Sequence, residues 1–297
     1  MLPRSLVPRC AVFALALGLA AGCSESPSAA VADTTDEIRP LDPSSVIAYE
    51  NFTVLGSSIY VMKVDGSGMT RLTPFNATTQ SWSPDGTRIA FSSTKDGNYE
   101  LYVMQADGSD IVRLTNTPAI DESSPAWSPD GASIVYLRSG PELWIMSSTG
   151  ANPRALTASG LRARYPSWSP DGTRIAFAAS DSIMTIRPDG TGLSRIGPNV
   201  PTSLPAWSPD GKRIAYIASI DGNVDIYSMR SDGTDVRRLT TDPARDSEPS
   251  WSPDGSHIVF STLRDIASHV YTMRADGTEQ LRIPNQGPNN GHPVWRP

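Results

Sequence analysis

Residues 82–86 read Trp-Ser-Pro-Asp-Gly, and this pentapeptide occurs five times in the 297-residue chain. The other copies begin at Trp127, Trp168, Trp207 and Trp251, and a sixth tryptophan, Trp295, stands near the C-terminus. Successive tryptophans are 45, 41, 39, 44 and 44 residues apart. This period is typical of the four-stranded blades of a β-propeller rather than of helical hairpins or leucine-rich units.

Each unit alternates tight turns with apolar runs. Proline presets φ in the pentapeptide and glycine accepts positive φ, so Ser83-Pro84-Asp85-Gly86 and its copies predict hairpin turns, with the aspartates in a structural role. Residues 89–91 and 101–104 are predicted strands, separated from a third run at 113–115 by a second turn, Asp107-Gly108. The inner runs are apolar at consecutive positions, which indicates that neighbouring blades cover both faces.

The two ends of the repeat region each hold part of a unit. Residues 45–73 contain three predicted strands without a preceding tryptophan turn, and residues 292–295 supply an isolated inner strand. We therefore expect an all-β, six-bladed propeller of four-stranded antiparallel blades over residues 45–297. Its last strand would pair with the N-terminal strands and close the ring, which removes exposed sheet edges.

The N-terminus indicates export. Arg4 and Arg9 precede an apolar stretch at residues 10–21 that is too short to span a bilayer, and Ala20-Ala21-Gly22-Cys23 follows. The segment resembles a bacterial lipoprotein signal, which implies a signal peptide at 1–22, lipid attachment at Cys23 and a flexible polar tether at 23–44. Ser24 favours the outer membrane by resemblance to proteobacterial sorting. Another extracytoplasmic membrane surface, or an ordinary secretory peptide cleaved nearby, remains an alternative.

Composition and motifs argue against several classes of function. Removal of residues 1–22 takes two of the 25 basic side chains and leaves 23 against 31 acidic ones, a net charge of −8. Without a basic cluster, nucleic acid is not an expected partner. The chain has no Gly-x-Ser-x-Gly, Walker or His-Glu-x-x-His motif, and we expect no cofactor. His269 and His292, expected in loops of neighbouring blades, are weak metal candidates because a third ligand is absent.

The repeats resemble those of a known family. Pro-x-Trp-Ser-Pro-Asp-Gly, followed by Arg-Ile-Ala-Phe, Leu-Tyr-Val-Met, Ala-Asp-Gly and Arg-Leu-Thr, is similar to the WD40-like or PD40 repeats of TolB-like β-propellers. The resemblance implies a periplasmic propeller that binds another lipoprotein and a disordered peptide. TolB carries an α/β domain ahead of its propeller, whereas a short polar linker precedes Ser45 here.

Differences between the units suggest a binding surface. The interval from the first strand to the second turn is 18 residues in four units, but 15 after Trp127 and 14 after Trp168. Two adjacent blades therefore have shortened loops, and the face opposite the regular turns should be lower there. Arginine and tyrosine are common interface anchors, so Arg162, Arg164 and Tyr165 are the first candidates. Further candidates lie in the connecting segments of the same face: Asp121, Glu122, Arg245 and Asp246.

These observations favour an envelope-anchored binding module, with no catalytic residues expected. It would recognise a protein or peptide through its loop face and central channel. We expect the protein itself to be a monomer. The alternative is an enzyme of lyase or glycoside hydrolase type, or a carbohydrate-binding protein, that uses the channel. Catalysis would need two or more titratable groups converging near the axis.

Overall fold

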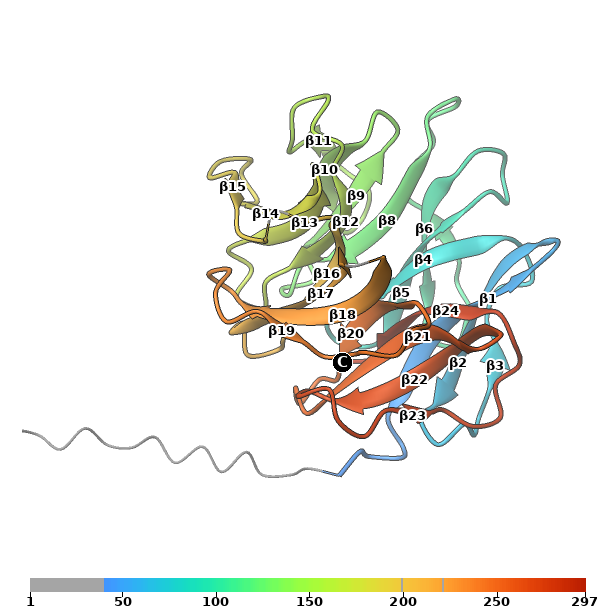
Figure 1. Ribbon diagram of the computed structural model, residues 1–297. Coiled ribbons are helices and arrows are strands. Elements are labelled where there is room, and N and C mark those ends of the chain that lie inside the picture. Colours follow the sequence, from blue (N-terminus) through green and yellow to red (C-terminus); the bar gives the residue numbers. More distant parts are fainter. Residues whose placement is uncertain (1–39, 199, 221) are drawn as a thin grey trace, which may run out of the picture. The chain divides into compact units, whose positions relative to one another are not determined.

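The protein forms a six-bladed β-propeller (Figure 1). The structure, a computed structural model, describes residues 40–198, 200–220 and 222–297. The expected signal peptide, Cys23 and most of the tether therefore lie outside the described residues. Within them the chain has 24 strands in six four-stranded sheets, as the repeat predicted. No helix in these ranges is long and apolar enough to cross a membrane.

Every blade uses its strands in the same spatial order. The innermost strands run up to the repeat tryptophans and are β4 (Ala77–Trp82), β8 (Glu122–Trp127), β12 (Arg164–Trp168), β16 (Thr202–Trp207), β20 (Asp246–Trp251) and β24 (Asn290–Trp295). The second strands are β1 (Val46–Thr53), β5 (Arg88–Ser93), β9 (Ser133–Arg138), β13 (Ile175–Ala179), β17 (Arg213–Ile220) and β21 (His257–Asp265). These are the consecutive apolar runs, and most of their residues are buried.

The outer half of each blade completes the sheet. The third strands are β2 (Gly56–Lys63), β6 (Glu100–Gln105), β10 (Glu142–Ser147), β14 (Ser182–Ile186), β18 (Asn223–Arg230) and β22 (Ala267–Arg274). The outermost strands have two residues each and are β3 (Thr70–Arg71), β7 (Val112–Arg113), β11 (Arg154–Ala155), β15 (Ser194–Arg195), β19 (Arg237–Arg238) and β23 (Leu281–Arg282). Such short edge strands limit edge-to-edge association.

The ring closes as expected, through the two ends of the repeat region. β24 pairs antiparallel with β1, placing Trp295 opposite Ile47 and Val294 opposite Ala48. The innermost strands then contact one another in cyclic order, from β4 through β8, β12, β16 and β20 to β24 and back to β4. The sheet that contains β1 is thus a blade made from both ends of the described chain.

The core lies between blades. One cluster joins Ile59 and Leu72 of one blade to Trp82 and Phe91 of the next, and other clusters repeat this arrangement. Four repeat tryptophans are buried and two are half-buried. Trp251 Nε1 donates a hydrogen bond of 3.1 Å to the carbonyl of Ala206 in the preceding blade. The tryptophans therefore hold neighbouring blades together, as the sequence predicted.

The pentapeptide turns satisfy their own polar groups. In the first, the Asp85 carboxylate accepts hydrogen bonds from Ser83 Oγ at 2.6 Å and from the Thr87 amide at 3.0 Å, and Gly86 has a φ of 64°. These bonds lower the pKa of Asp85 to about 2. The turns at Asp130, Asp171, Asp210 and Asp254 repeat this pattern. The structural role predicted for these aspartates is confirmed.

Candidate functional site: channel mouth and adjacent cleft

The innermost strands share an unusual backbone conformation three residues before each tryptophan. All six residues there have a left-handed φ of 46° to 59°, and none is glycine: Thr79, Ser124, Tyr165, Leu204, Glu248 and His292. In each strand the register of pairing to the second strand is interrupted at or beside this residue. Such a conformation is costly for non-glycine residues and persists where surrounding structure enforces it, often at functional sites.

These six residues surround the axial channel. They line a cavity of about 140 Å³ together with the residues that follow them, five of which are prolines. Side chains of one blade bind the amide of the next: Ser124 N donates to Thr79 Oγ1 at 3.2 Å, and His292 N donates to Glu248 Oε2 at 2.6 Å. The channel residues are therefore held partly by contacts between blades.

A carboxylate and an imidazole pair inside this channel. Glu248 Oε1 lies 2.9 Å from His292 Nε2, and Ser261 Oγ donates to Glu248 Oε2 at 2.5 Å. Burial alone would raise the pKa of Glu248, but His292 and the hydrogen bonds outweigh it and lower the pKa to about 2. Burial would likewise lower the pKa of His292, yet Glu248 and Glu50 raise it to about 9. The pair is therefore an ion pair at neutral pH.

A second carboxylate, that of Glu50, interacts electrostatically with the Glu248–His292 pair. Glu50 of β1 is fully buried and accepts hydrogen bonds from Thr79 N at 2.5 Å and Thr78 Oγ1 at 2.7 Å. Burial raises the pKa of Glu50, against the opposing effects of His292 and these two donors. Glu50 thus fixes the left-handed segment of β4, and its electrostatic influence reaches the channel pair.

A separate cleft opens beside the channel, over the blade that contains β16. β13 and β14 have five residues each, whereas β17 and β18 have eight. Three residues of strand correspond to about 10 Å, so the lower hairpin leaves a step beside its taller neighbour. A cavity of about 380 Å³ occupies this step, with Ala179 and Asp181 on the lower side and Ile217 and Val224 on the taller side. The lowering predicted after Trp168 is confirmed, but it comes from shorter strands, because two residues separate the strands in both hairpins.

Three of the predicted binding residues meet at this cleft. Arg162 and Arg164 line it from the blade before β16, and Arg245 lines it from the blade after. All three side chains are exposed, and within the described residues they form no ion pair or side-chain hydrogen bond. Arg162 also has a left-handed φ of 56°. The cleft therefore presents guanidinium groups that are free to bind a ligand.

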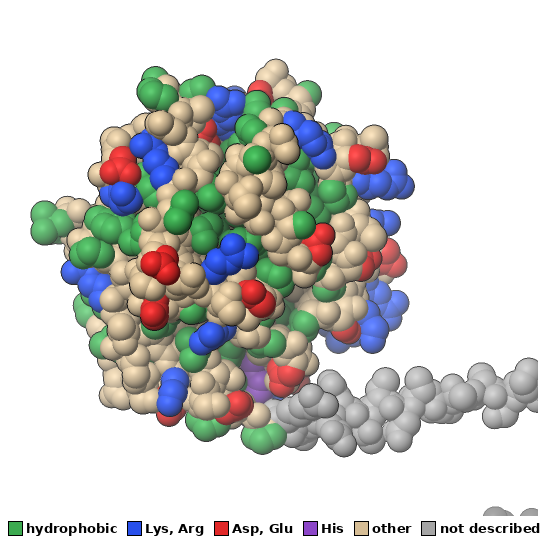
Figure 2. Space-filling model, turned by 180° about the vertical axis from the view of Figure 1, so that it is seen from behind, with side chains coloured by type: hydrophobic (Ala, Val, Ile, Leu, Met, Phe, Trp, Pro, Cys, Tyr) green, Lys and Arg blue, Asp and Glu red, His purple; other side chains and the backbone are tan. Residues whose placement is uncertain are grey.

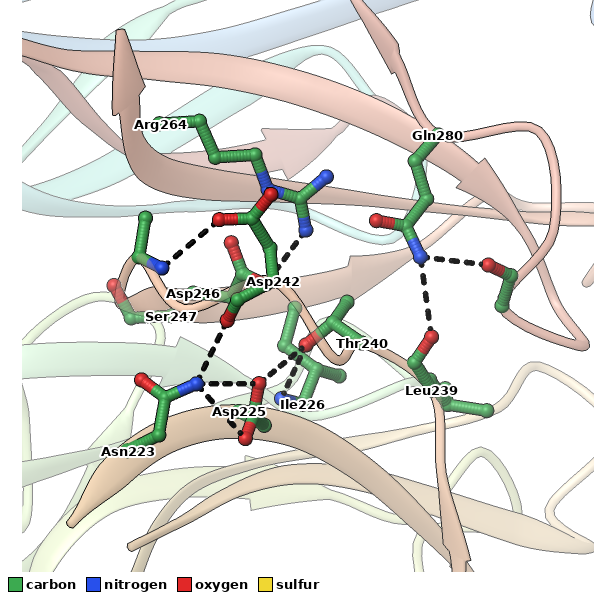
Figure 3. A network of polar contacts seen from close by, with 12 residues as sticks. Asn223, Asp225, Ile226, Leu239, Thr240, Asp242, Asp246, Ser247, Arg264 and Gln280 are labelled. Atoms are coloured by element: carbon green, nitrogen blue, oxygen red, sulfur yellow. Dashed lines mark hydrogen bonds and ion pairs between the residues drawn. The ribbon is translucent and has the colours of Figure 1, made fainter.

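A polar network holds the segment that carries Arg245 (Figure 3). Asn223 Nδ2 donates to the Asp242 carbonyl at 2.7 Å, and Asp242 Oδ1 accepts from the Ala244 amide at 2.9 Å. Arg264 Nη2 lies 2.7 Å from Asp246 Oδ2, on the other side of Arg245 in the chain. The backbone before and after Arg245 is thus tied to two blades.

The remaining candidates are placed differently. Tyr165 lines the channel and not the arginine cleft. Asp121 accepts a 2.9 Å hydrogen bond from the Tyr99 amide. Glu122 and Asp246 are buried, Glu122 against Thr117 and Arg138 and Asp246 against Arg264. Burial raises the pKa of Glu122 to about 7, and the nearby Glu100 adds to the shift. These three carboxylates contact other segments of the protein itself.

The two histidines lie in strands, so the expectation of loop positions was wrong. His269 belongs to β22, is buried and contacts the Ala267 carbonyl through Nδ1 at 3.0 Å. His292 belongs to β24 and faces Glu248. In the described part of the chain, no three His, Cys, Asp or Glu side chains are grouped so that they could hold a metal ion.

Sequence reasoning missed Glu50, and it did not single out Glu248. Glu248 occupies the repeat position three residues before a tryptophan, where the six units carry six different side chains before a mostly constant proline. This contrast between a variable position and a mostly constant proline could have identified Glu248 as a candidate functional residue. Glu50 gave no such signal, because its role depends on Thr78 and Thr79, which belong to another blade. Figure 2 shows one face of the molecule, on which basic and acidic side chains are interspersed.

The fold and site define a closed six-bladed propeller with an axial channel and one off-axis cleft. The family model described as TolB beta propeller domain matches residues 41–196 and 197–297. The chain therefore belongs to the TolB β-propeller family. No curated protein sequence matches it significantly.

Solved structures agree on the fold. TolB from Acinetobacter baumannii is 22% identical with a TM-score of 0.76, and the match covers 87% of this chain and 68% of that one. A protein assigned as TolB from Agrobacterium tumefaciens is 23% identical with a TM-score of 0.66, covering 86% and 100%. Hydrazine synthase from Kuenenia stuttgartiensis is 16% identical with a TM-score of 0.72, covering 86% of this chain and 47% of that one.

Proposed function

We propose that the protein is a non-catalytic binding module of the cell envelope, which recognises a protein or peptide through the loop face of its propeller. One observation carries this proposal: the channel mouth and the cleft beside it are lined by side chains from several blades, including three arginines that have no partner within the described residues. Membership of the TolB family, whose scaffold suits protein binding, supports it.

Affinity capture from detergent-solubilised envelopes tests the binding function. The bait is the purified protein, and the matched variant combines Arg162→Asn, Arg164→Ser and Tyr165→Ser. These replacements copy the residues at the same repeat positions in other blades: Asn289, Ser123 and Ser124. We expect a protein captured by the wild type and lost from the variant. If the wild type captures nothing above a bait-free control, the proposed function is wrong.

Envelope attachment is proposed to run through a lipid on Cys23, with the outer membrane as its location. The residues before Cys23 and the periplasmic setting of the TolB family support this. Cells labelled with radioactive palmitate should incorporate label into the wild type and not into Cys23→Ala. Membrane fractionation should place the wild type in the outer membrane. Label retained by the variant would exclude this anchor.

A second candidate function is an enzyme or carbohydrate-binding protein that acts in the channel. The Glu248–His292 pair favours it, since two titratable groups converge near the axis. The pair is saturated, however, because Glu248 accepts three hydrogen bonds and therefore makes a poor general base. The test incubates wild type and His292→Asn with a panel of acidic and neutral oligosaccharides. Cleavage products formed by the wild type alone would favour the enzyme over the binding module.

A further inference from the structure

The arginines of the cleft are exceptions to the repeat. Arg164 stands four residues before its tryptophan, where the other five blades carry small residues: Thr78, Ser123, Ser203, Ser247 and Gly291. Arg162 stands six residues before Trp168, and its counterpart Asn289 has nearly the same left-handed φ, 62° against 56°. The fold therefore does not require arginine at either position, because other blades are built without it.

Their convergence creates a positive region on an acidic protein. Among the described residues, three arginines and one acidic residue, Asp181, line the cleft, whereas the whole chain has 25 basic and 31 acidic side chains. Arg162 and Arg164 face Arg245 from blades on opposite sides of β16–β19. Guanidinium groups bind carboxylates through paired hydrogen bonds, so this arrangement suits a ligand with several carboxylates.

The geometry points to a binding site for an acidic peptide segment in this cleft, an inference that rests on the proposed function and specifies its ligand. Arg162, Arg164 and Arg245 would pair with carboxylates of the segment, and Ile217 and Val224 would pack against an apolar side chain between them. The step of about 10 Å recesses part of the site below the taller hairpin, which suits an inserted segment better than a flat membrane surface.

Fluorescence anisotropy with labelled peptides tests the site on the purified full-length protein. The probe is a hexapeptide with three glutamates and one leucine, compared with the same peptide carrying glutamines. We expect the acidic peptide to bind at least about tenfold more tightly, and each of Arg162→Asn, Arg164→Ser and Arg245→Asn to weaken it about tenfold. Binding of the acidic peptide should also weaken as the salt concentration rises from about 0.05 to about 0.5 M, because salt screens the attraction between exposed charges.

Lys212→Thr is the matched control. Lys212 is an exposed base in a pentapeptide turn, on the opposite face, where two other blades carry threonine. It should leave peptide binding unchanged. Equal binding of both peptides, unchanged binding by the arginine variants, or equal loss in Lys212→Thr would overturn the acidic-peptide site. Arginine-dependent binding to vesicles containing phosphatidylglycerol, without peptide binding, would also overturn it in favour of a membrane contact.

The two proposals fail in different ways. If wild-type protein captures an envelope partner and the three arginine variants capture it equally well, the binding module stands and the cleft is not its site. If the wild type captures no partner and binds neither peptide, both proposals are wrong.

Discussion

The two faces of the propeller are built from the same repeats but use polar side chains differently. On the turn face, five aspartates each accept hydrogen bonds from their own turn. On the loop face, three arginines have no partner among the described residues, and two hollows open side by side in the fold. The comparison teaches that what repeats maintains the fold, while exceptions to the repeat indicate the candidate site.

The largest effect on stability is expected between the blades, beside the turn face. Trp127 is 6% exposed, and Arg88 stacks on its ring with the guanidinium carbon 4.7 Å from the ring centroid. Trp127→Ala should lower the free energy of unfolding by about 3–5 kcal/mol. Urea denaturation followed by tryptophan fluorescence measures this loss. A loss below about 1 kcal/mol would contradict the structural role of the repeat tryptophans.

The Glu248–His292 pair in the channel should contribute an intermediate amount to the free energy of unfolding, and this contribution should depend on pH. The folded pKa of His292 is about 9 against an ordinary 6.5, so its contribution is complete below pH 6.5 and is lost as pH rises through 9. The folded pKa of Glu248 is about 2 against 4.5, so its contribution is complete above pH 4.5 and is lost as pH falls through 2. Both shifts describe one interaction, on the order of 2 kcal/mol.

His292→Asn tests this, since asparagine tolerates the left-handed backbone. Urea denaturation at pH 5.5, 7.5 and 9.5 should show the greatest difference between wild type and variant at pH 5.5, and a much smaller one at pH 9.5. A difference that does not change with pH would show that His292 contributes only packing.

A smaller effect is expected within one pentapeptide turn. Ser169 Oγ donates to Asp171 at 2.6 Å and accepts from the Arg174 amide at 2.9 Å. Ser169→Ala should lower the free energy of unfolding by about 1 kcal/mol, because it leaves the Arg174 amide without its side-chain acceptor. Thermal denaturation is a sufficient measurement, with Thr173→Ala as a more exposed comparison in the same turn. An unchanged midpoint for Ser169→Ala would contradict the account of the turn face.

The smallest effect on stability should come from the loop face. Arg162→Asn with Arg164→Ser should change the free energy of unfolding by less than about 0.5 kcal/mol, since both side chains are exposed and have no partner in the described chain. Urea denaturation of the double variant beside Lys212→Thr measures this. A loss above about 1.5 kcal/mol would mean that the arginines serve the fold, and the distinction between the two faces would disappear.

Most of the fold followed from the sequence, because its determinants are local and repeated. The pentapeptide turns, the apolar runs and even the pairing of β24 with β1 were predictable from the spacing of the tryptophans and the incomplete units. The shortened interval after Trp168 also placed the lowered hairpin correctly. The interval alone did not tell whether loop or strand residues were missing.

The site was only partly predictable, because burial depends on distant segments. Arg162 and Arg164 could be selected for their position beside a short hairpin. Their meeting with Arg245 depends on a blade about 80 residues away in the chain, as subtraction of the residue numbers shows. Glu122 looks like a loop residue until Thr117 and Arg138 are placed against it. Glu50 bonds to Thr79 across a blade boundary, which no local pattern reveals.

The pairing of β24 with β1 has a consequence for biosynthesis. Until the final strand has left the ribosome, β1 lacks its inner neighbour, and its inner edge is unpaired. A premature stop that removes only the last strand would therefore expose apolar residues such as Ile47 to proteases and other chains. Burial of these residues is therefore completed only when β24, the last strand to be synthesised, pairs with β1, the first.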